Sequence, residues 1–126
     1  MILLVEDDES VRLLMGIVLS RAGYRVLDCS SGPAAQLIWT RHRASIRLLI
    51  SDIVMLPGMN GADLARLFLA EQPGLKVILM SGYHSEATEA RASFGPEVGF
   101  ILKPFSRDEL LAAVRSQLNS DEMKPV

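Results

Sequence analysis

The chain has 126 residues, of which 49% are hydrophobic and 22% charged, and a formal net charge of -2 at pH 7. This length and composition predict one globular domain that buries roughly two-thirds of its unfolded surface. The slightly negative charge offers no basic surface to nucleic acid, no apolar run approaches the roughly 20 residues that span a membrane, and a lone Cys29 excludes an internal disulfide.

The two ends of the chain differ in character. Residues 2–5 are apolar and follow Met1 without a basic leader. This run is too short for the core of a signal peptide, so we expect a cytoplasmic protein. The last apolar pattern ends near Leu118, and the segment NSDEMKPV that follows is polar. We therefore expect the domain to cover residues 1–119 and residues 120–126 to form a flexible tail or linker.

Five apolar runs recur along the chain and predict five β-strands. Most of the runs are continuous rather than alternating with polar residues, a pattern typical of strands that are covered on both faces. The runs are residues 2–5, 24–29, 46–51, 76–80 and 99–102.

A helical pattern follows each of these runs. The first has apolar residues at spacings of three and four and ends at Gly23, and the second begins at Gly32, before a proline that a first turn tolerates. The third ends before Pro73, the fourth is mostly polar, and the fifth opens on a capping box of Ser106 and Glu109. We expect helices over residues 11–22, from 32 to about 39, around 64–68, over 85–93 and over 106–118.

Strand and helix alternate five times, which predicts a parallel sheet with helices on both faces. In such a sheet, ligands bind outside the carboxyl ends of the strands, where the winding direction reverses. Polar residues follow four of the predicted strands: Glu6, Asp7 and Asp8 after the first, Asp52 after the third, Ser81 after the fourth and Lys103 after the fifth. All of them are therefore expected at one edge of the sheet.

The acids at this edge predict a cation site. For a strand order of 2-1-3-4-5 the first and third strands are neighbours, so the acid cluster and Asp52 face each other. Two carboxylates 4 Å apart repel by roughly 4 kcal/mol at the effective dielectric of a protein surface, and a cation relieves this repulsion. Oxygen ligands with room for water favour Mg²⁺ or Mn²⁺ over zinc, and Lys103 offers a second positive charge.

Each of these residues also has a simpler structural interpretation. Asp8 and Glu9 are favoured in the first turn of a helix by its dipole, and we keep that interpretation for both. Asp52, Ser81 and Lys103 could each be an ordinary turn residue after a strand. Their joint placement at one edge favours a shared site instead.

The segments LLVEDDESVR, LLISDIVM, MSGY and LKPFSRDEL, in this order and spacing, resemble the receiver domain of bacterial two-component response regulators. The resemblance extends from residue 2 to about residue 118. It implies a flavodoxin-like α/β fold, with a doubly wound five-stranded parallel sheet of order 2-1-3-4-5 and five helices.

The resemblance also implies a phosphoacceptor and its metal ligands. Asp52 matches the aspartate that accepts a phosphoryl group, and Asp7 matches a direct ligand of Mg²⁺. Glu6 would act largely through a bound water, and the backbone carbonyl of Val54 would be the third protein ligand. Together with Lys103, the metal should lower the pKa of Asp52 and keep it ionised for attack on phosphorus.

Further positions match residues that contact or sense the phosphoryl group. Ser81 and Lys103 would bind phosphoryl oxygens, and Pro104 matches a cis proline, which an X-Pro bond tolerates. A phosphoryl group adds about -1.5 to -2 charges, so Ser81 should move toward it and Phe100 should turn inward as an aromatic switch. The alternative for Phe100 is a plain core residue. The output face is then expected on the fourth helix, fifth strand and fifth helix, through which a homodimer is possible.

The implied function is phosphoryl transfer to Asp52 from a phosphohistidine on a histidine kinase or phosphotransfer protein. We expect this domain to catalyse only its own phosphorylation and dephosphorylation, without contacts to nucleic acid or membrane. Eight residues separate Asp52 from Gly61, and Pro57 falls five residues after Asp52. This longer loop resembles that of receivers fused to hybrid histidine kinases.

Two alternatives from other classes remain. One is a pseudo-receiver that serves only as a binding module, although such a module has no need of the complete set of acids, hydroxyl and lysine. The other is a metal-dependent phosphatase with an aspartyl nucleophile, which usually needs a second acid near the nucleophile. Here Ile53 and Val54 follow Asp52.

Overall fold

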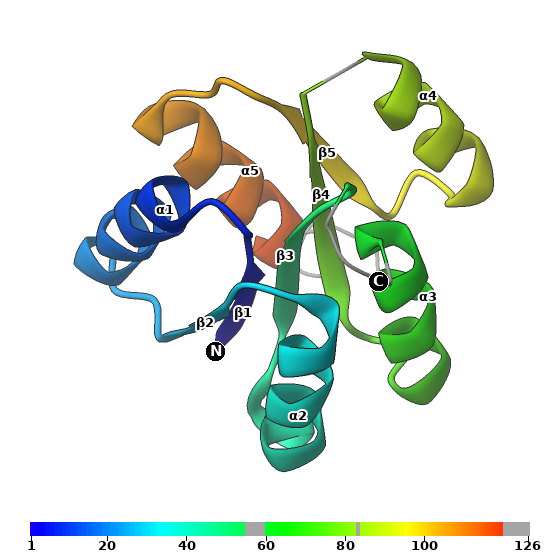
Figure 1. The fold of residues 1–126 in the computed structure, drawn as a ribbon, viewed down its shortest axis with the longest axis horizontal. Helices are drawn as coiled ribbons and strands as arrows, with labels where there is room; N and C mark the ends of the chain where they lie inside the picture. Colours follow the sequence, from blue (N-terminus) through cyan, green and yellow to red (C-terminus); the bar gives the residue numbers. More distant parts are fainter. Residues whose placement is uncertain (55–59, 83, 120–126) are drawn as a thin grey trace.

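The computed structural model describes residues 1–54, 60–82 and 84–119, and only the backbone of residues 84–87 (Figure 1). Within these residues, one sheet contains five parallel strands and is accompanied by five α-helices. The strands are β1 (Ile2–Val5), β2 (Val26–Cys29), β3 (Leu48–Asp52), β4 (Lys76–Ser81) and β5 (Gly99–Leu102). The helices are α1 (Glu9–Arg21), α2 (Gly32–His42), α3 (Gly61–Glu71), α4 (His84–Ser93) and α5 (Arg107–Asn119), with a short 3₁₀ turn η1 (Arg43–Ser45).

The strand order is β2-β1-β3-β4-β5, as the resemblance implied. All four strand pairs are parallel. β1 lies between β2 and β3, and its Val5 is in register with Cys29 on one side and Ser51 on the other. The chain therefore winds one way to β2 and the other way through β3 to β5, so the reversal lies between β1 and β3.

Helices cover both faces of the sheet, with α1 and α5 on one face and α2, α3 and α4 on the other (Figure 1). Alternate residues of each strand enter the two cores. In β1, Leu3 and Val5 pack with the residues of α2 and α3, whereas Ile2 and Leu4 pack with those of α1 and α5. The continuous apolar runs in the sequence follow from this arrangement, because both faces of a strand are buried.

Two strands begin later than the apolar runs predicted. Tyr24 lies in the apolar run 24–29, but its backbone N–H bonds to the carbonyl of Leu19 and so completes the end of α1. Ile46 likewise bonds to the carbonyls of His42 and Arg43 in the turn that follows α2. Both side chains are apolar and fill the core or its border, but their backbones close helix ends instead of joining the sheet.

The local signals for helix ends are confirmed. The Ser106 hydroxyl accepts the N–H of Glu109 at 3.1 Å, and the Glu109 carboxylate accepts the N–H of Ser106 at 3.1 Å, which is the reciprocal capping box. Gly23 follows α1 with a φ of 99°, a conformation that glycine adopts without steric cost.

The predicted loop with Pro57 and the predicted tail over residues 120–126 lie outside the described residues. None of the helices in the part of the chain that the structure describes has both the length and the hydropathy that a membrane span requires.

Candidate functional site

The acids that follow β1 and β3 meet at the carboxyl edge of the sheet. Asp52 is the last residue of β3, and Glu6 and Asp7 come directly after β1. One carboxylate oxygen from each of the three lies within 4.8 Å of the others. Glu6 is fully buried and Asp52 is 7% exposed, whereas Asp7 is exposed to solvent. We call these three residues the acidic group.

Lys103, which directly follows β5, joins the acidic group. Its Nζ lies 2.7 Å from Oε2 of Glu6 and 2.9 Å from the carboxylate of Asp52. The backbone N–H of Lys103 donates to the carbonyl of Ser81 at 2.8 Å, which holds the start of the following loop against the end of β4. The ammonium therefore links residues that lie 97 and 51 positions away in the sequence.

The pKa of Asp52 is raised from 3.8 to about 7. Burial is the largest cause, and the neighbouring Glu6 adds to it, while Lys103 acts in the opposite direction. The sequence led us to expect a lowered pKa from a metal together with Lys103. The ammonium by itself does not outweigh burial and the second carboxylate, and the lowering expected from a bound metal together with Lys103 stays a prediction.

The pKa of Lys103 is raised above its ordinary value. Burial by itself lowers it, but the hydrogen bonds to Asp52 and Glu6 outweigh burial because they favour the charged ammonium. The charged lysine is therefore the stable form at this edge. It faces two buried carboxylates, and the exposed carboxylate of Asp7 lies beside them.

The donor set of the acidic group fits a hard divalent cation. It offers three carboxylates, and one of them is open to solvent, so water can complete the coordination. With all carboxylates ionised, one lysine leaves the group with excess negative charge. Val54 stands two residues after Asp52 at the border of the described residues, and the role of its carbonyl stays a prediction.

Asp8 belongs to the helix rather than to the acidic group. Its Oδ1 accepts the backbone N–H of Val11 at 3.1 Å, and it is the N-cap residue of α1. Glu9 is the first residue of that helix. The structural interpretation of both residues is confirmed, since an N-cap carboxylate satisfies a backbone donor that has no partner within the helix.

Ser81 and Phe100 lie on β4 and β5, the two strands that follow β3 in the sheet order. Ser81 is the last residue of β4 and is 3% exposed. Phe100 is half-buried in β5 and packs against the core under α2, α3 and α4. The guanidinium of Arg91 in α4 lies 5.0 Å from the centre of the Phe100 ring. Their roles as a switch stay predictions. The peptide bond between Lys103 and Pro104 is cis.

Two residues that sequence reasoning did not single out support the acidic group. Arg12 in α1 reaches back to the backbone carbonyl of Glu6. Gly61 begins α3 against the end of β3, where a Cβ atom would lie 1.8 Å from the backbone oxygen of Asp52. The only signal for Gly61 was its place after a turn-forming stretch, and Arg12 carried none beyond its position in a helix.

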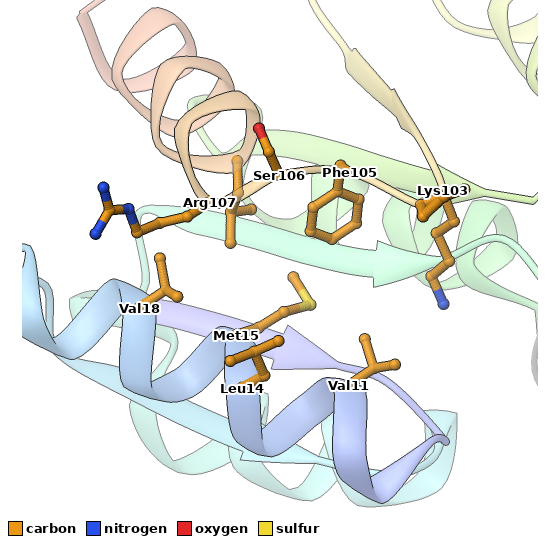
Figure 2. Close-up of a pocket in the computed structure, with 10 residues that line it drawn as sticks. Val11, Leu14, Met15, Val18, Lys103, Phe105, Ser106 and Arg107 are labelled. Atoms are coloured by element: carbon orange, nitrogen blue, oxygen red, sulfur yellow. The ribbon is translucent and has the colours of Figure 1, made fainter.

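An apolar groove of about 610 Å³ lies beside the site, between α1 and the segment that leads into α5 (Figure 2). Figure 2 shows Val11, Leu14 and Met15 of α1 opposite Phe105, with Lys103 at one end of the groove. Leu14 is 63% exposed, although it is a large apolar residue. The groove therefore joins an exposed apolar surface to the charged edge of the sheet.

The doubly wound sheet and the acidic edge define a flavodoxin-like α/β domain, and three comparisons identify its relatives. A family model described as "Response regulator receiver domain" matches residues 2–115. The sensor kinase CckA of Brucella abortus is 33% identical over 121 residues, which are 96% of this chain and 13% of that protein. The sensory transduction protein RegX3 of Mycobacterium tuberculosis is 34% identical over 120 residues, 93% of this chain and 50% of that protein.

A solved structure agrees with these relatives. The crystal structure of a response regulator receiver protein from Sinorhizobium medicae superposes with a TM-score of 0.85 at 28% identity, covering 94% of each chain. The chain therefore belongs to the response regulator receiver domain family of two-component systems. It spans half or less of the length of the two curated relatives named here.

Proposed function

We propose that Asp52 is the phosphoacceptor of this receiver domain. The observation that carries the proposal is the geometry around its carboxylate. Asp52 lies at the edge of the sheet where the winding reverses, in contact with the ammonium of Lys103 and beside the carboxylates of Glu6 and Asp7. These are the groups that phosphoryl transfer to a carboxylate requires: a nucleophile, a fixed positive charge and ligands for a divalent cation.

The metal is Mg²⁺, or Mn²⁺ in its place. Asp7 and Asp52 would hold it directly, Glu6 largely through a water, and the carbonyl of Val54 would complete the protein ligands. When bound, the metal neutralises charge on the transferring phosphoryl group. Its positive charge would also lower the pKa of Asp52, which burial and Glu6 raise to about 7, and would keep the carboxylate ionised for attack on phosphorus.

The chemistry of the transfer is a displacement at phosphorus. A carboxylate oxygen of Asp52 forms a bond to phosphorus while the P–N bond to the donor histidine breaks, and the imidazole leaves with the bonding electron pair. The product is an acyl phosphate on Asp52. The Lys103 ammonium, now paired with Asp52, would bind one phosphoryl oxygen, and the Ser81 hydroxyl would bind another.

The acyl phosphate changes the preferred conformation of the face formed by α4, β5 and α5. Ser81 moves toward the phosphoryl group, and Phe100 turns inward toward the space beside it. The half-buried position of Phe100 supports this proposal, because its ring can exchange an outer position for an inner one. Such a change shifts populations between two states of one fold, and the same face is the proposed dimer contact.

The donor is a histidine kinase or a histidine phosphotransfer protein, the partners with which receiver domains interact. It must present its phosphohistidine at the acidic edge, so its surface must lie against the rim of the site. The groove lined by Leu14, Met15 and Phe105 adjoins that rim and is the apolar surface on which we place the donor. The likeness to CckA, whose receiver domain structure is described as that of a hybrid histidine kinase, supports a parent chain of that kind. We place the domain in the cytoplasm as part of the same proposal.

Incubation with Mg²⁺ and acetyl phosphate tests the proposal. Intact-mass analysis should show one added phosphoryl group that is stable in acid and labile in base. Asp52→Asn should abolish it, whereas Asp108→Asn, at a side chain that is 85% exposed in α5, should not. No uptake by the wild-type chain would favour a binding module, and steady turnover of unrelated phosphoesters would favour a phosphatase.

A further inference from the structure

The side chain of Arg12 lies behind the acidic group. It comes from the first turn of α1, and its Nη1 donates to the backbone carbonyl of Glu6 at 2.8 Å. Its Nε lies 3.9 Å from Oδ1 of Asp28 in β2. The Arg12 side chain is only 21% exposed, although long charged side chains on a surface helix usually extend into water. The guanidinium thus joins α1, β2 and the end of β1.

The position of Glu6 explains why this contact matters. Glu6 directly follows Val5, the last residue of β1, which is in register with Cys29 and Ser51. Its N–H donates to the carbonyl of Cys29 at 3.1 Å, and its own carbonyl accepts from Arg12. Its buried carboxylate accepts from Lys103 and from the N–H of Asp8 at 3.1 Å. Arg12 is therefore the charged donor on the peptide group that joins Glu6 to Asp7.

The two contacts of Arg12 differ in strength. An ion pair at 3.9 Å to a carboxylate that is 50% exposed contributes little by itself, because solvent screens it. The hydrogen bond to the Glu6 carbonyl is short and charge-assisted, and such bonds are roughly twice as strong as neutral ones. The role of Asp28 is then to orient the guanidinium, and the role of Arg12 is to hold the backbone.

We propose that Arg12, oriented by Asp28, is a positioning residue for the acidic group, which places the carboxylates of Glu6 and Asp7 for cation binding. The inference rests on the proposed function, because it assigns those carboxylates to the metal. Loss of the Arg12 donor leaves the Glu6 carbonyl without its charged partner, so the segment from Glu6 to Asp8 loses one of the hydrogen bonds that hold its backbone. Partners that orient ligating groups typically change metal affinity 10- to 100-fold when they are removed.

The experiment compares Arg12→Gln and Arg12→Lys with Arg21→Gln, which changes an exposed arginine in the last turn of the same helix. Calorimetry should show that Arg12→Gln raises the Mg²⁺ dissociation constant about 10-fold or more, whereas Arg21→Gln stays near wild type. Arg12→Lys should recover part of the affinity, since an ammonium can still donate to the carbonyl. In protein treated with EDTA, hydrogen exchange of the Glu6 amide should accelerate most in Arg12→Gln, less in Arg12→Lys, and should stay near wild type in Arg21→Gln.

The exchange measurement separates the two proposals. If wild-type protein fails to bind Mg²⁺, the proposed function fails, but faster exchange of the Glu6 amide in Arg12→Gln still establishes that Arg12 holds this segment. If wild-type protein binds Mg²⁺ and Arg12→Gln binds it as tightly as Arg21→Gln does, the positioning role is refuted. Urea unfolding of each variant measures its global stability. It thereby shows whether the protein is still folded under the conditions in which Mg²⁺ affinity is measured.

Discussion

Replacement of Lys103 by methionine should lower the free energy of unfolding, because the buried carboxylates at the sheet edge lose their cation. Lys103 is the cation of the described structure that contacts both Glu6 and Asp52, which are 0% and 7% exposed. Methionine has a similar length and keeps the apolar part of the side chain, so Lys103→Met removes mainly the charge. Two carboxylates would then face each other at the edge without the ammonium between them.

The magnitude follows from the distances. At an effective dielectric of about 20, a unit charge pair at the observed 2.7 Å and 2.9 Å attracts by about 6 kcal/mol in each case. The net loss of stability is smaller for two reasons. The wild-type lysine loses hydration when the chain folds, which offsets part of this attraction, and Asp52 in the variant can take up a proton. Removal of one partner from a buried ion pair costs about 3–5 kcal/mol, and we expect the free energy of unfolding to fall by about this amount at pH 8.

The effect should depend on pH. In the folded wild type the pKa of Asp52 is about 7, above its ordinary 3.8, so the folded state binds more protons between these values and stability falls as pH rises through them. Lys103→Met removes a cause that lowers this pKa, so the fall should extend above pH 7. The variant should therefore differ less from wild type at pH 5 than at pH 8.

Urea denaturation with added EDTA, at pH 5 and pH 8, measures both effects. The double variant Lys103→Met, Asp52→Asn is the matched control, because it removes the facing carboxylate as well. Its stability at pH 8 should lie well above that of Lys103→Met. Equal losses at pH 5 and pH 8, or no recovery in the double variant, would refute the assignment of the loss to an unpaired buried carboxylate.

Three further predictions concern the metal, the end of β3 and the groove. Mg²⁺ at about 100 times its dissociation constant should stabilise the wild type by about 2.7 kcal/mol in thermal or urea unfolding, and should stabilise Asp52→Asn much less. Gly61→Ala should destabilise the fold by more than about 2 kcal/mol in urea unfolding, since its Cβ would lie 1.8 Å from the backbone oxygen of Asp52. Leu14→Asp should slow transfer from a phosphorylated histidine phosphotransfer protein at least about 10-fold in a radiolabel assay, while uptake from acetyl phosphate stays near wild type.

Each of these predictions has a contrary outcome. Equal stabilisation of wild type and Asp52→Asn by Mg²⁺ would place the cation elsewhere. A Gly61→Ala protein as stable as wild type would mean that α3 can shift away from β3 without cost. Leu37 is 68% exposed on α2, on the opposite face of the sheet, and Leu37→Asp is the control for Leu14→Asp. Equal transfer rates for these two variants would exclude the groove as the donor surface.

Much of the fold could be predicted because its signals are local. Continuous apolar runs marked strands covered on both faces, and the Ser106 capping box and Gly23 marked helix ends through contacts within a few positions. Strand starts were less certain. The apolar side chains of Tyr24 and Ile46 suit a strand, but their backbone N–H groups complete turns, and a hydrophobic pattern does not distinguish the two.

The candidate site also has features that the sequence predicted and features that it did not. The sequence by itself determined which polar residues lie at the carboxyl edge, because parallel strands must end on the same side. Only the tertiary structure decided that Lys103 contacts both Glu6 and Asp52, that burial raises the pKa of Asp52 to about 7, and that Arg12 holds the Glu6 carbonyl. Side-chain direction, burial and charge compensation depend on groups brought together from distant positions, and a local pattern contains no information on those distances.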